Sequence, residues 1–342
     1  MNRRYRLRRR PESSRVEADF ELVEEPIPEV GPGQALVRTL WLSIDPSNRI
    51  WLSEVDYGLP PVPVGSVMRG LGIGQVVESQ REDMSPGDLV SGPTGWADYT
   101  LADDQVNVLA FSVVTSPVNA PLTALLGPLG HTGITAYLGV HDIGKPQPGE
   151  TMVISAAAGA VGSVAGQIGK ARGARVVGIA GSVQKCRYVV DELGFDACIN
   201  YKDPHWRAHL EQATPDGIDV DFENVGGQIM EQVVERLNVG GRVVLCGLMS
   251  EYTTLGSSRL QHGVDVAQIM IKRAHIGSFL VLDNADRFPE AIEYLSGLIE
   301  DGKLTYDETV IDGLERAPEA LNQMFAGSNT GKLLIKVAER CV

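Results

Sequence analysis

The stretch Thr151–Gly162, TMVISAAAGAVG, decides the fold of this chain of 342 residues. Its first five residues, Thr151–Ser155, predict a buried strand, and the residues after the glycines predict a helix. Gly159 and Gly162 have the spacing of the last two glycines of the dinucleotide fingerprint, with Ala156 in the first position. The helix N-terminus would then hold a pyrophosphate, because its free N–H groups and its dipole favour an anion. The alternative is a tight turn that binds nothing.

Short apolar runs and helical stretches alternate after this loop. We expect further strands at Arg175–Ala180, Ala197–Asn200, Asp219–Glu223 and Arg242–Cys246. We expect the helices between them at Val161–Ala171, Lys185–Leu193 and Gln228–Leu237. Strands that alternate with helices at this spacing predict a parallel, doubly wound sheet, so residues 123–302 are expected to form an α/β Rossmann domain.

The chain before this domain has a different pattern. Residues 1–122 hold short strands such as Gln34–Leu42 and Gly72–Val77, separated by turns rich in Gly and Pro. They predict a small β-barrel or a distorted sheet. The last segment, 303–342, contains a terminal strand at Lys332–Val337, and we expect it to return to the first domain and close its sheet.

Charge and hydropathy exclude several kinds of partner. The chain has 30 Lys and Arg against 44 Asp and Glu, which gives a formal net charge of −14. Nucleic acids and anionic membranes need positive charge, so neither is expected as a partner, and no apolar run is long enough to span a bilayer. Six arginines stand among the first ten residues. We interpret them as a solvated basic edge of a first strand, with a processed or partner-binding arm as the alternative.

The cysteines and histidines do not form a metal-binding pattern. Cys186, Cys198, Cys246 and Cys341 are scattered without a CxxC pair, which predicts neither a disulfide framework nor a zinc knuckle and is typical of a cytoplasmic protein. The first 120 residues contain no Cys and no His. A pair of histidines four residues apart is expected to lie on the surface: His205 and His209.

Residues at the end of the second predicted strand indicate which dinucleotide binds. NAD-binding folds usually place Asp or Glu there to hold the ribose 2′-OH, whereas this chain has Ala180, Gly and Ser182. A 2′-phosphate needs cations and hydroxyl donors, which Lys185, Ser182 and Tyr201 could supply. We therefore predict NADPH/NADP⁺ as the cofactor; the alternative for Lys185 is a solvated lysine at a helix start. Asn224 follows a buried strand and is expected at the same ligand-binding edge.

Several motifs together resemble one known family. The longer ones are Ala156–Gln167 (AAAGAVGSVAGQ), Val177–Lys185 (VGIAGSVQK), Phe222–Gly227 (FENVGG) and Cys246–Tyr252 (CGLMSEY). The shorter ones are Ser43–Pro46 (SIDP), Gly133–Tyr137 (GITAY) and Asn329–Lys332 (NTGK). Over nearly its whole length the chain resembles the medium-chain dehydrogenase/reductase superfamily, in the zinc-independent branch of prostaglandin reductase/leukotriene B4 dehydrogenase and bacterial curcumin reductase-like enzymes.

The resemblance implies a GroES-like β-barrel domain before the Rossmann domain, and a homodimer formed through edge strands. It implies that the pyrophosphate lies on Gly159, Ala160, Val161 and Gly162, and that Lys185 and Tyr201 hold the 2′-phosphate. The ribose and nicotinamide would be contacted by Asn224, Cys246, Gly247, Leu248, Met249, Ser250, Tyr252, Phe279, Leu280, Val281 and Asn329. Where zinc-dependent relatives carry Gly-His-Glu, this chain has Gly65–Gly70 (GSVMRG).

Without a metal, reduction of an activated C=C bond is the expected chemistry. Hydride from the nicotinamide would pass to the β-carbon of an enone or enal, and hydrogen-bond donors would stabilise the enolate. Tyr252 is our first candidate for the tyrosine that donates a hydrogen bond or a proton, and Tyr57, in a proline-rich loop, is the second. Many members of this branch carry Asp-Pro-Tyr-Met-Arg where this chain has Asp45–Arg49 (DPSNR), so the substrate does not follow from the resemblance.

Two other functions remain open. A quinone or carbonyl reductase could use the same scaffold, and product analysis separates it from an enone reductase because the latter leaves the carbonyl intact. A protein that senses NADPH without turnover would bind the cofactor tightly, but no enone or quinone would cause its oxidation. A methyltransferase is disfavoured, because its second strand usually ends in an acidic residue.

Overall fold

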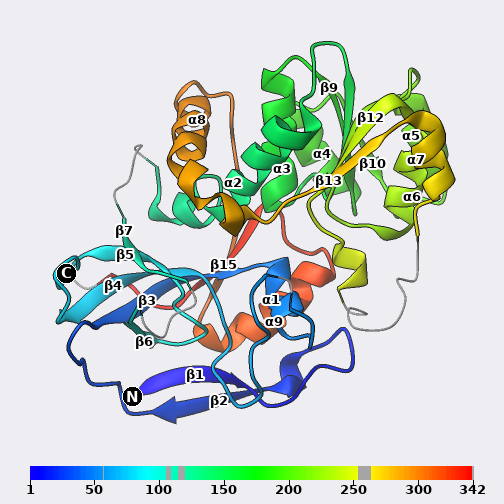
Figure 1. The fold of residues 1–342 in the computed structure, drawn as a ribbon. Helices are drawn as coiled ribbons and strands as arrows, with labels where there is room; N and C mark the ends of the chain where they lie inside the picture. Colours follow the sequence, from blue (N-terminus) through cyan, green and yellow to red (C-terminus); the bar gives the residue numbers. More distant parts are fainter. Residues whose placement is uncertain (57, 105–108, 115–119, 253–262, 341–342) are drawn as a thin grey trace. The chain divides into compact units, whose positions relative to one another are not determined.

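The computed structural model describes residues 1–56, 58–104, 109–114, 120–252 and 263–340. The chain forms two compact units (Figure 1): unit 1 comprises Met1–Leu126 with Glu308–Val342, and unit 2 comprises Gly127–Asp307. From the sequence we expected the boundaries between these two units after residues 122 and 302 instead.

Unit 2 is built on six parallel strands. They are β8 (Thr151–Ser155), β9 (Arg175–Ala180), β10 (Ala197–Asn200), β11 (Ile218–Glu223), β12 (Leu237–Leu245) and β13 (His275–Ser278). Their order is β10-β9-β8-β11-β12-β13, and every neighbouring pair is parallel. The order reverses between β8 and β11, as in a Rossmann fold, so the predicted doubly wound sheet is confirmed.

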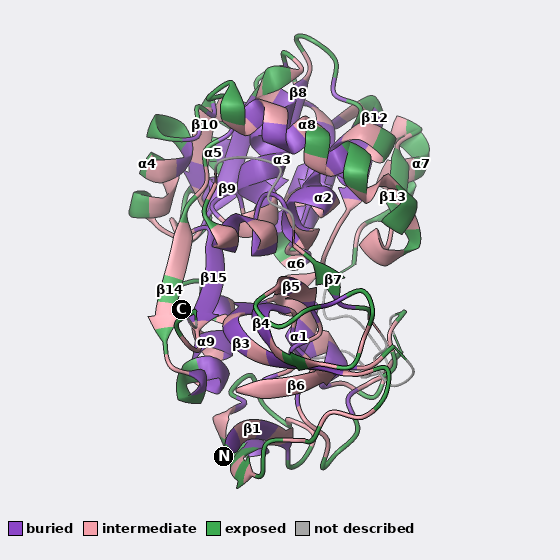
Figure 2. Cartoon of the chain, turned by 90° about the vertical axis from the view of Figure 1, so that its left-hand side faces the viewer, coloured by how far each residue is buried: buried purple, intermediate pink, exposed green. Residues whose placement is uncertain are grey.

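Helices cover both faces of this sheet. They are α2 (His131–Leu138), α3 (Ala160–Ala171), α4 (Val183–Asp191), α5 (Trp206–Ala213), α6 (Gly227–Glu235), α7 (Val266–Lys272) and α8 (Phe288–Glu300). In Figure 1, α2, α3 and α8 lie on one side of the sheet, and α5, α6 and α7 lie on the other. The central strands β8, β9 and β11 are almost entirely buried, whereas the outer faces of the helices are exposed (Figure 2). Aliphatic side chains such as Val153, Val177 and Val243 are fully buried in the core.

Several boundaries in unit 2 differ from the sequence expectation by one or more residues, and the structure explains the larger differences. The helix expected at Gln228–Leu237 ends at Glu235, because Leu237 already pairs with Ile218 as the first residue of β12. The strand β12 therefore runs through the Gly240–Gly241 pair that we expected to precede it. The helix expected from Lys185 begins at Val183, because the hydroxyl of Ser182 caps it.

Unit 1 contains a seven-stranded sheet and a two-stranded one. The larger sheet joins β3 (Ala35–Ile44), β4 (Gly72–Ser79), β5 (Leu89–Gly92), β6 (Tyr99–Ala102), β7 (Ser112–Val113), β14 (Glu308–Asp312) and β15 (Lys332–Lys336). The smaller one pairs β1 (Asn2–Leu7) with β2 (Phe20–Glu25). The terminal strand β15 pairs antiparallel with β3, so the end of the chain completes the sheet that its beginning forms.

Two of the family-like motifs meet inside unit 1. Asp45 begins the helix α1 (Pro46–Trp51), where its backbone N–H donates to Asn48 Oδ1 at 2.8 Å. The ammonium of Lys332 forms an ion pair with the Asp45 carboxylate and donates to the carbonyl of Ile44, and its side chain is only 3% exposed. The motifs SIDP and NTGK thus hold the end of β3 against the start of β15. A second helix, α9 (Ala317–Phe325), packs against α1.

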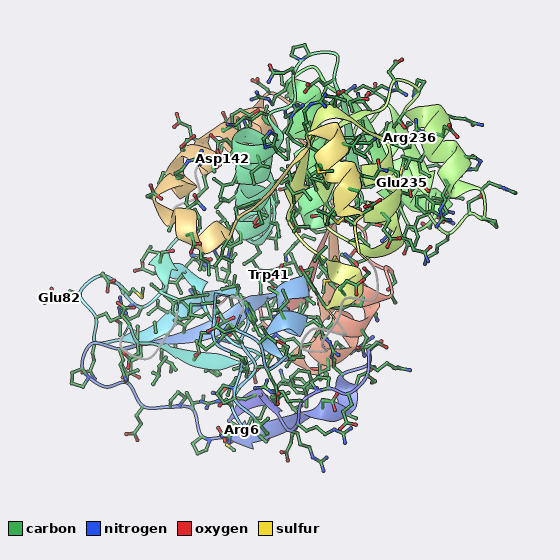
Figure 3. The ribbon with its side chains drawn as sticks, turned by 45° about the vertical axis from the view of Figure 1, so that its right-hand side comes forward. Arg6, Trp41, Glu82, Asp142, Glu235 and Arg236 are labelled. Atoms are coloured by element: carbon green, nitrogen blue, oxygen red, sulfur yellow. The ribbon has the colours of Figure 1, made fainter. Side chains whose placement is uncertain are left out.

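The three arginines of β1 differ from the expectation of a solvated edge, whereas Arg8 and Arg9 are exposed as expected. Strand β1 forms, but its arginines are half-buried and paired with acids: Arg3 Nε lies 2.9 Å from Asp98 Oδ2, and Arg4 and Arg6 both pair with Glu25. Figure 3 labels Arg6. The pairing partners lie on β2 and beside β6, which the sequence pattern alone does not bring next to β1. In the described part of the chain, no helix is long and apolar enough to cross a membrane.

Candidate cofactor site

The glycine loop connects β8 to α3 as the fingerprint predicts. Gly159 is the N-cap of α3, with extended φ/ψ of −90° and 172°. A Cβ at Gly162 would lie 2.5 Å from the carbonyl oxygen of Ala156, so only glycine fits there. Ala156 has a φ of +50°, in the left-handed region that disfavours L-residues, and such strain is often retained at ligand sites.

The first residues of α3 present the predicted anion site. Ala160 and Val161 follow the cap, and the N–H groups of a first helical turn have no partner within the helix. A Cβ at Gly159 would meet only the Ala156 carbonyl, at 3.2 Å, so the protein leaves room beside this residue. The loop therefore fits a pyrophosphate.

Four residues at the ends of β9 and β10 come together. Gly181 lies against the ring of Tyr201: a Cβ at Gly181 would be only 3.2 Å from Tyr201 Cε1. The backbone N–H of Tyr201 donates to Ala180 at 3.1 Å. Ser182 Oγ accepts from the N–H of Lys185 at 3.1 Å, which leaves the hydroxyl hydrogen for a ligand. The structure thus brings together Ser182, Lys185 and Tyr201, the donors predicted from the sequence.

A second lysine, which the sequence reasoning missed, lies beside Lys185. Burial, and then the charge of Lys202, lower the pKa of Lys185. The ammonium of Lys202 lies 5.9 Å from the centre of the Tyr201 ring. Among the described residues, no carboxylate forms a salt bridge with either lysine. Two neighbouring cations of this kind fit a 2′-phosphate, because a dianion would relieve their repulsion. The position of Lys202, directly after Tyr201, was the available sequence signal.

A buried hydrogen-bond network holds the ends of β8 and β11. Ser155 Oγ donates to Glu223 Oε1 at 2.6 Å, and the same oxygen accepts the N–H of Gly226 at 2.8 Å. Asn224 donates its backbone N–H to Ser155 Oγ and its side-chain amide to the Ser155 carbonyl, both at 2.7 Å. One of the two N–H donors of the Asn224 amide is therefore already used in positioning the loop. Glu223 was missed as a positioning residue, although a carboxylate in the buried strand DVDFE was a sequence signal.

The segment Cys246–Tyr252 is pinned to this loop. Cys246 and Gly247 donate to the Glu223 carbonyl at 2.9 and 3.0 Å, and Met249 donates to that of Asn224 at 3.1 Å. Ser250 donates to the Val225 carbonyl through both its N–H and its hydroxyl. Burial, and then the charge of Glu223, raise the pKa of the Cys246 thiol to about 12, so this thiol stays protonated at neutral pH.

Tyr252 turns its phenol back onto the same segment. The N–H of Leu248 donates to the Tyr252 hydroxyl oxygen at 3.2 Å. The ring is half-buried, and the hydroxyl oxygen would lie 3.0 Å from a Cβ at Gly247. Tyr252 therefore stands at the carboxyl end of β12, among the residues predicted to face the cofactor. Tyr57, the second candidate for the tyrosine that donates a hydrogen bond or a proton, lies outside the described residues.

The remaining predicted contacts lie in two different units. Phe279, Leu280 and Val281 are half-buried and follow directly after β13, at the same edge of the unit 2 sheet as the loops after β8, β9, β11 and β12. Asn329 belongs to unit 1, where its side-chain amide donates to the Gly331 carbonyl at 3.1 Å. A role for Asn329 toward the cofactor stays a prediction.

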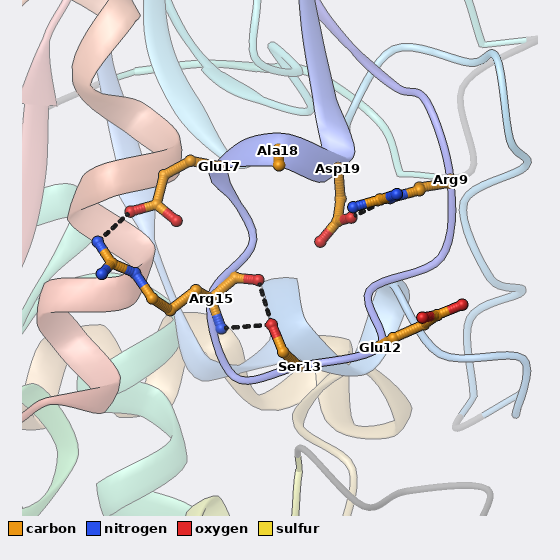
Figure 4. Close-up of a pocket in the computed structure, with 7 residues that line it drawn as sticks. All are labelled: Arg9, Glu12, Ser13, Arg15, Glu17, Ala18 and Asp19. Carbon is orange, nitrogen blue, oxygen red and sulfur yellow. Dashed lines mark hydrogen bonds and ion pairs between the residues drawn. The ribbon is translucent and has the colours of Figure 1, made fainter.

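A surface hollow outside this edge pairs both of its arginines with acidic residues of its own lining. It measures about 420 Å³ and lies in the N-terminal loop of unit 1 (Figure 4). Arg9 Nε lies 2.6 Å from Asp19 Oδ1, and Arg15 pairs with Glu17 at 3.2 Å. Its lining residues are Arg9, Glu12, Ser13, Arg15, Glu17, Ala18 and Asp19.

The described residues do not fit a metal centre. Among them, no group of three or more His, Cys, Asp or Glu side chains could hold a metal ion. In the GSVMRG stretch, Met68 is fully buried in the core and Arg69 donates to the Pro60 carbonyl. His205 and His209 are both exposed at the start of α5.

The fold and this edge of the sheet define a dinucleotide-binding protein of the Rossmann class. Residues 3–109 match the family described as the N-terminal domain of oxidoreductase, and residues 160–297 match the family described as zinc-binding dehydrogenase. The chain belongs to the medium-chain dehydrogenase/reductase superfamily, in its zinc-independent enone reductase branch.

Relatives of known name match almost the whole chain. The NADPH-dependent curcumin reductase of Escherichia coli is 39% identical over 345 residues, covering 98% of this chain and 97% of that protein. The NADP(+)-dependent 2-alkenal reductase of Nicotiana tabacum is 36% identical, covering 96% and 94%. The crystal structure of CurA from Vibrio vulnificus in complex with NADPH superposes with a TM-score of 0.92 at 36% identity, covering 98% of this chain and 99% of that one.

Proposed function

We propose that this protein is an NADPH-dependent reductase of activated C=C bonds in α,β-unsaturated ketones and aldehydes. The observation that carries the cofactor assignment is the pair Lys185 and Lys202 beside Ser182, at a strand end without a carboxylate. The reaction is supported by relatives whose names specify reduction of 2-alkenals, pulegone and curcumin.

Each part of the site has a task in this reaction. When bound, NADPH supplies a hydride from C4 of its nicotinamide. The first turn of α3 binds the pyrophosphate, and Lys185, Lys202 and Tyr201 bind the 2′-phosphate. The loop that Glu223 and Ser155 hold in place positions the segment 246–252 along the ribose and the nicotinamide.

We assign to Tyr252 the task of hydrogen-bonding the enolate and supplying a proton. The enolate oxygen that forms after hydride transfer needs a donor, and the phenol is a suitable one. The N–H of Leu248 would stabilise the phenolate left after proton transfer. Replacement of Tyr252 by Phe is expected to lower kcat about 10²-fold, within the range for a lost general acid, with little change in the Kd of NADPH.

The proposed function is tested by NADPH consumption with a panel of enones, enals and quinones, combined with the mass and the NMR spectrum of each product, because the saturated ketone and the allylic alcohol have the same mass. An enone reductase yields a saturated ketone two hydrogens heavier than the substrate, with its carbonyl intact. Consumption with quinones alone, or formation of an allylic alcohol, would contradict the proposal. Tight NADPH binding without oxidation by any substrate would indicate a sensor.

We further propose that the protein is a cytoplasmic homodimer that pairs through β13. This strand ends the order of the unit 2 sheet. Large apolar side chains are exposed on it and on the preceding helix α7, namely Val266, Met270, Ile271 and Ile276. An edge strand with an apolar border of this kind favours pairing with a second copy.

A further inference from the structure

Two cysteines that are 12 residues apart in sequence lie in contact within unit 2. Cys186 stands in the first turn of α4, and Cys198 stands on the neighbouring strand β10. Their Sγ atoms are 2.9 Å apart, and both are free thiols. A disulfide needs an S–S distance of about 2.05 Å, so a small movement would allow the bond.

The environment makes one thiol the nucleophile and the other its partner. The hydrogen bond that Cys198 donates lowers the pKa of the Cys186 thiol. The N-terminal turn of α4 favours a thiolate at Cys186 through the helix dipole. The same contact and burial raise the pKa of Cys198, which therefore stays protonated until its partner has reacted. Both residues are half-buried, so a small reagent can reach the pair.

The two cysteines are directly connected to the proposed 2′-phosphate site. Lys185 precedes Cys186, and the N–H of Cys186 donates to the carbonyl of Ser182 at 3.0 Å. Tyr201 and Lys202 come directly after β10, the strand that carries Cys198. The cysteine contact therefore joins the two segments that supply the phosphate donors.

We propose that Cys186 and Cys198 are a redox modification site, at which a reversible disulfide weakens the binding of NADPH. This proposal rests on the proposed function insofar as it assigns the 2′-phosphate to Lys185, Lys202 and Tyr201. The formation of the disulfide itself does not depend on that assignment.

The oxidant is a small-molecule disulfide such as oxidised glutathione. The Cys186 thiolate attacks one sulfur of that disulfide, its S–S bond breaks, and one glutathione leaves as a thiol after taking up a proton. Cys198 then loses its proton and attacks Cys186 Sγ, which releases the second glutathione. Two protein thiols are oxidised, and one disulfide is reduced to two thiols.

The bond would change the spacing of the phosphate donors. The sulfurs must approach from 2.9 Å to about 2.05 Å, with a Cβ–S–S–Cβ dihedral near 90°. This draws the first turn of α4 toward β10 and shifts Lys185 relative to Tyr201 and Lys202. Only the binding of NADPH should weaken, because NADH has no 2′-phosphate whose contacts could be lost.

The first experiment maps the bond. The full-length protein is incubated with excess oxidised glutathione and analysed by intact mass and by tryptic peptides without reduction. We expect a protein two hydrogens lighter, in which the peptide 186–187 is linked to the peptide 188–202, with Cys246 unmodified. Stable glutathione adducts or unreacted thiols at both positions, with no link between them, would overturn the proposal.

The second experiment measures the Kd of NADPH and of NADH for the reduced and the oxidised protein by calorimetry. We expect oxidation to raise the Kd of NADPH at least about fivefold, the lower end of typical coupling between sites, and to leave that of NADH unchanged. Dithiothreitol should restore the original Kd. The variant Cys186→Ser, which lacks the attacking thiol, should show no effect of the oxidant, whereas Cys198→Ser should keep a stable glutathione adduct at Cys186 and form no disulfide.

The remaining outcomes separate this proposal from the proposed function. A mapped disulfide with unchanged NADPH affinity, or with equal loss of both cofactors, would refute the effect on the phosphate site. A reduced protein that binds NADH as tightly as NADPH would refute the proposed cofactor instead, while a mapped 186–198 bond would still support the modification site.

Discussion

Lys185 and Lys202 concentrate positive charge at the ends of β9 and β10, where NAD-specific folds place an acid. If they hold the 2′-phosphate, replacing Lys185 by Ala removes a hydrogen bond between charged groups, worth about 1.5–3 kcal/mol. We expect the KM of NADPH to rise about 10- to 100-fold and that of NADH to stay the same. Steady-state kinetics with both cofactors measures the change.

Lys303→Ala is the matched control, because Lys303 is an exposed lysine of the same unit that pairs with Asp301. It should leave both constants unchanged. Equal KM values for the two cofactors in the unmodified protein, together with a neutral Lys185→Ala, would mean that Lys185 is only a solvated helix-start lysine.

Asp221 is a fully buried carboxyl group in the centre of the unit 2 sheet. Neither of its oxygens has a hydrogen-bond partner among the described residues. Burial, and then the charge of Glu223, raise the pKa of Asp221 well above its usual range. A raised folded-state pKa contributes stability below the unfolded value of about 3.9, and this contribution is lost as pH rises toward the folded value.

Asp221→Asn should therefore become more stable relative to the unmodified protein as pH rises from about 5 to 8. The free energy of unfolding, measured by urea titration at several pH values, tests this. Asp216→Asn removes an exposed carboxylate of the same unit and serves as the control. A difference between Asp221→Asn and the unmodified protein that does not change with pH, or that falls as pH rises, would show that Asp221 ionises without cost.

Site residues were predictable where a local motif specifies them. The glycines of the loop and the missing acid after Ala180 could be interpreted from the sequence, because both depend on neighbours within a few residues. Glu223 and Lys202 could not be assigned with the same security. Their roles depend on contacts with Ser155 and Lys185, which lie 68 and 17 positions away in the chain.

At the scale of elements, two glycines of the loop between β8 and α3 allow an effect on packing to be distinguished from an effect on NADPH binding. A Cβ at Gly162 would lie 2.5 Å from the Ala156 oxygen, whereas one at Gly159 would lie 3.2 Å from it. Gly162→Ala should lower the free energy of unfolding by about 1–3 kcal/mol, as overpacking does, and should also abolish NADPH binding.

Gly159→Ala should fold with nearly unchanged stability and yet bind NADPH more weakly, because its methyl group would occupy the space expected for the pyrophosphate. Thermal unfolding and calorimetry on both variants distinguish the two effects. Wild-type affinity in a folded Gly159→Ala protein would show that the pyrophosphate does not approach this loop.

Element type was more predictable than element boundaries. The strands β9 and β10 have the bounds expected from their apolar runs, since Gly181 follows β9 and Asp196 precedes β10. Strand β12 extends to Leu237 because its first residue pairs with Ile218, and a neighbouring strand leaves no signal in the local sequence. The ion pairs of the N-terminal arginines depend in the same way on distant acids.

For the whole molecule, the proposed association through β13 is tested at the apolar side chains that are exposed on it. Ile276 is 43% exposed on this edge strand, and Met270 is 72% exposed on α7. A charge on an edge strand opposes pairing, so Ile276→Lys should convert the dimer to a monomer of 36.8 kDa. Sedimentation velocity measures the mass.

Val239→Lys is the control for this variant, because Val239 is 64% exposed but lies on β12 rather than at the sheet edge. It should remain dimeric. A monomeric unmodified protein, or a dimer that persists in Ile276→Lys, would exclude this edge as the interface.

The α/β class and the parallel sheet followed from the sequence, because alternation of strands and helices is a periodic signal over more than 100 residues. The completion of the unit 1 sheet by β15 depends on pairs such as Leu333 with Ile44, for which the sequence offers only the absence of another partner. The substrate is not specified at this scale, because Asp45–Arg49 departs from the family pattern and Tyr57 lies outside the described residues.

The most direct test of the central claim follows the hydride itself. The protein is supplied with NADPH carrying deuterium at both C4 positions and with a simple enone, and the product is examined by mass spectrometry and NMR. We predict a saturated ketone with one deuterium on the β-carbon and an unchanged carbonyl group. Deuterium on the carbonyl carbon of an allylic alcohol, or oxidation of the cofactor with no deuterium in any product, would contradict the account.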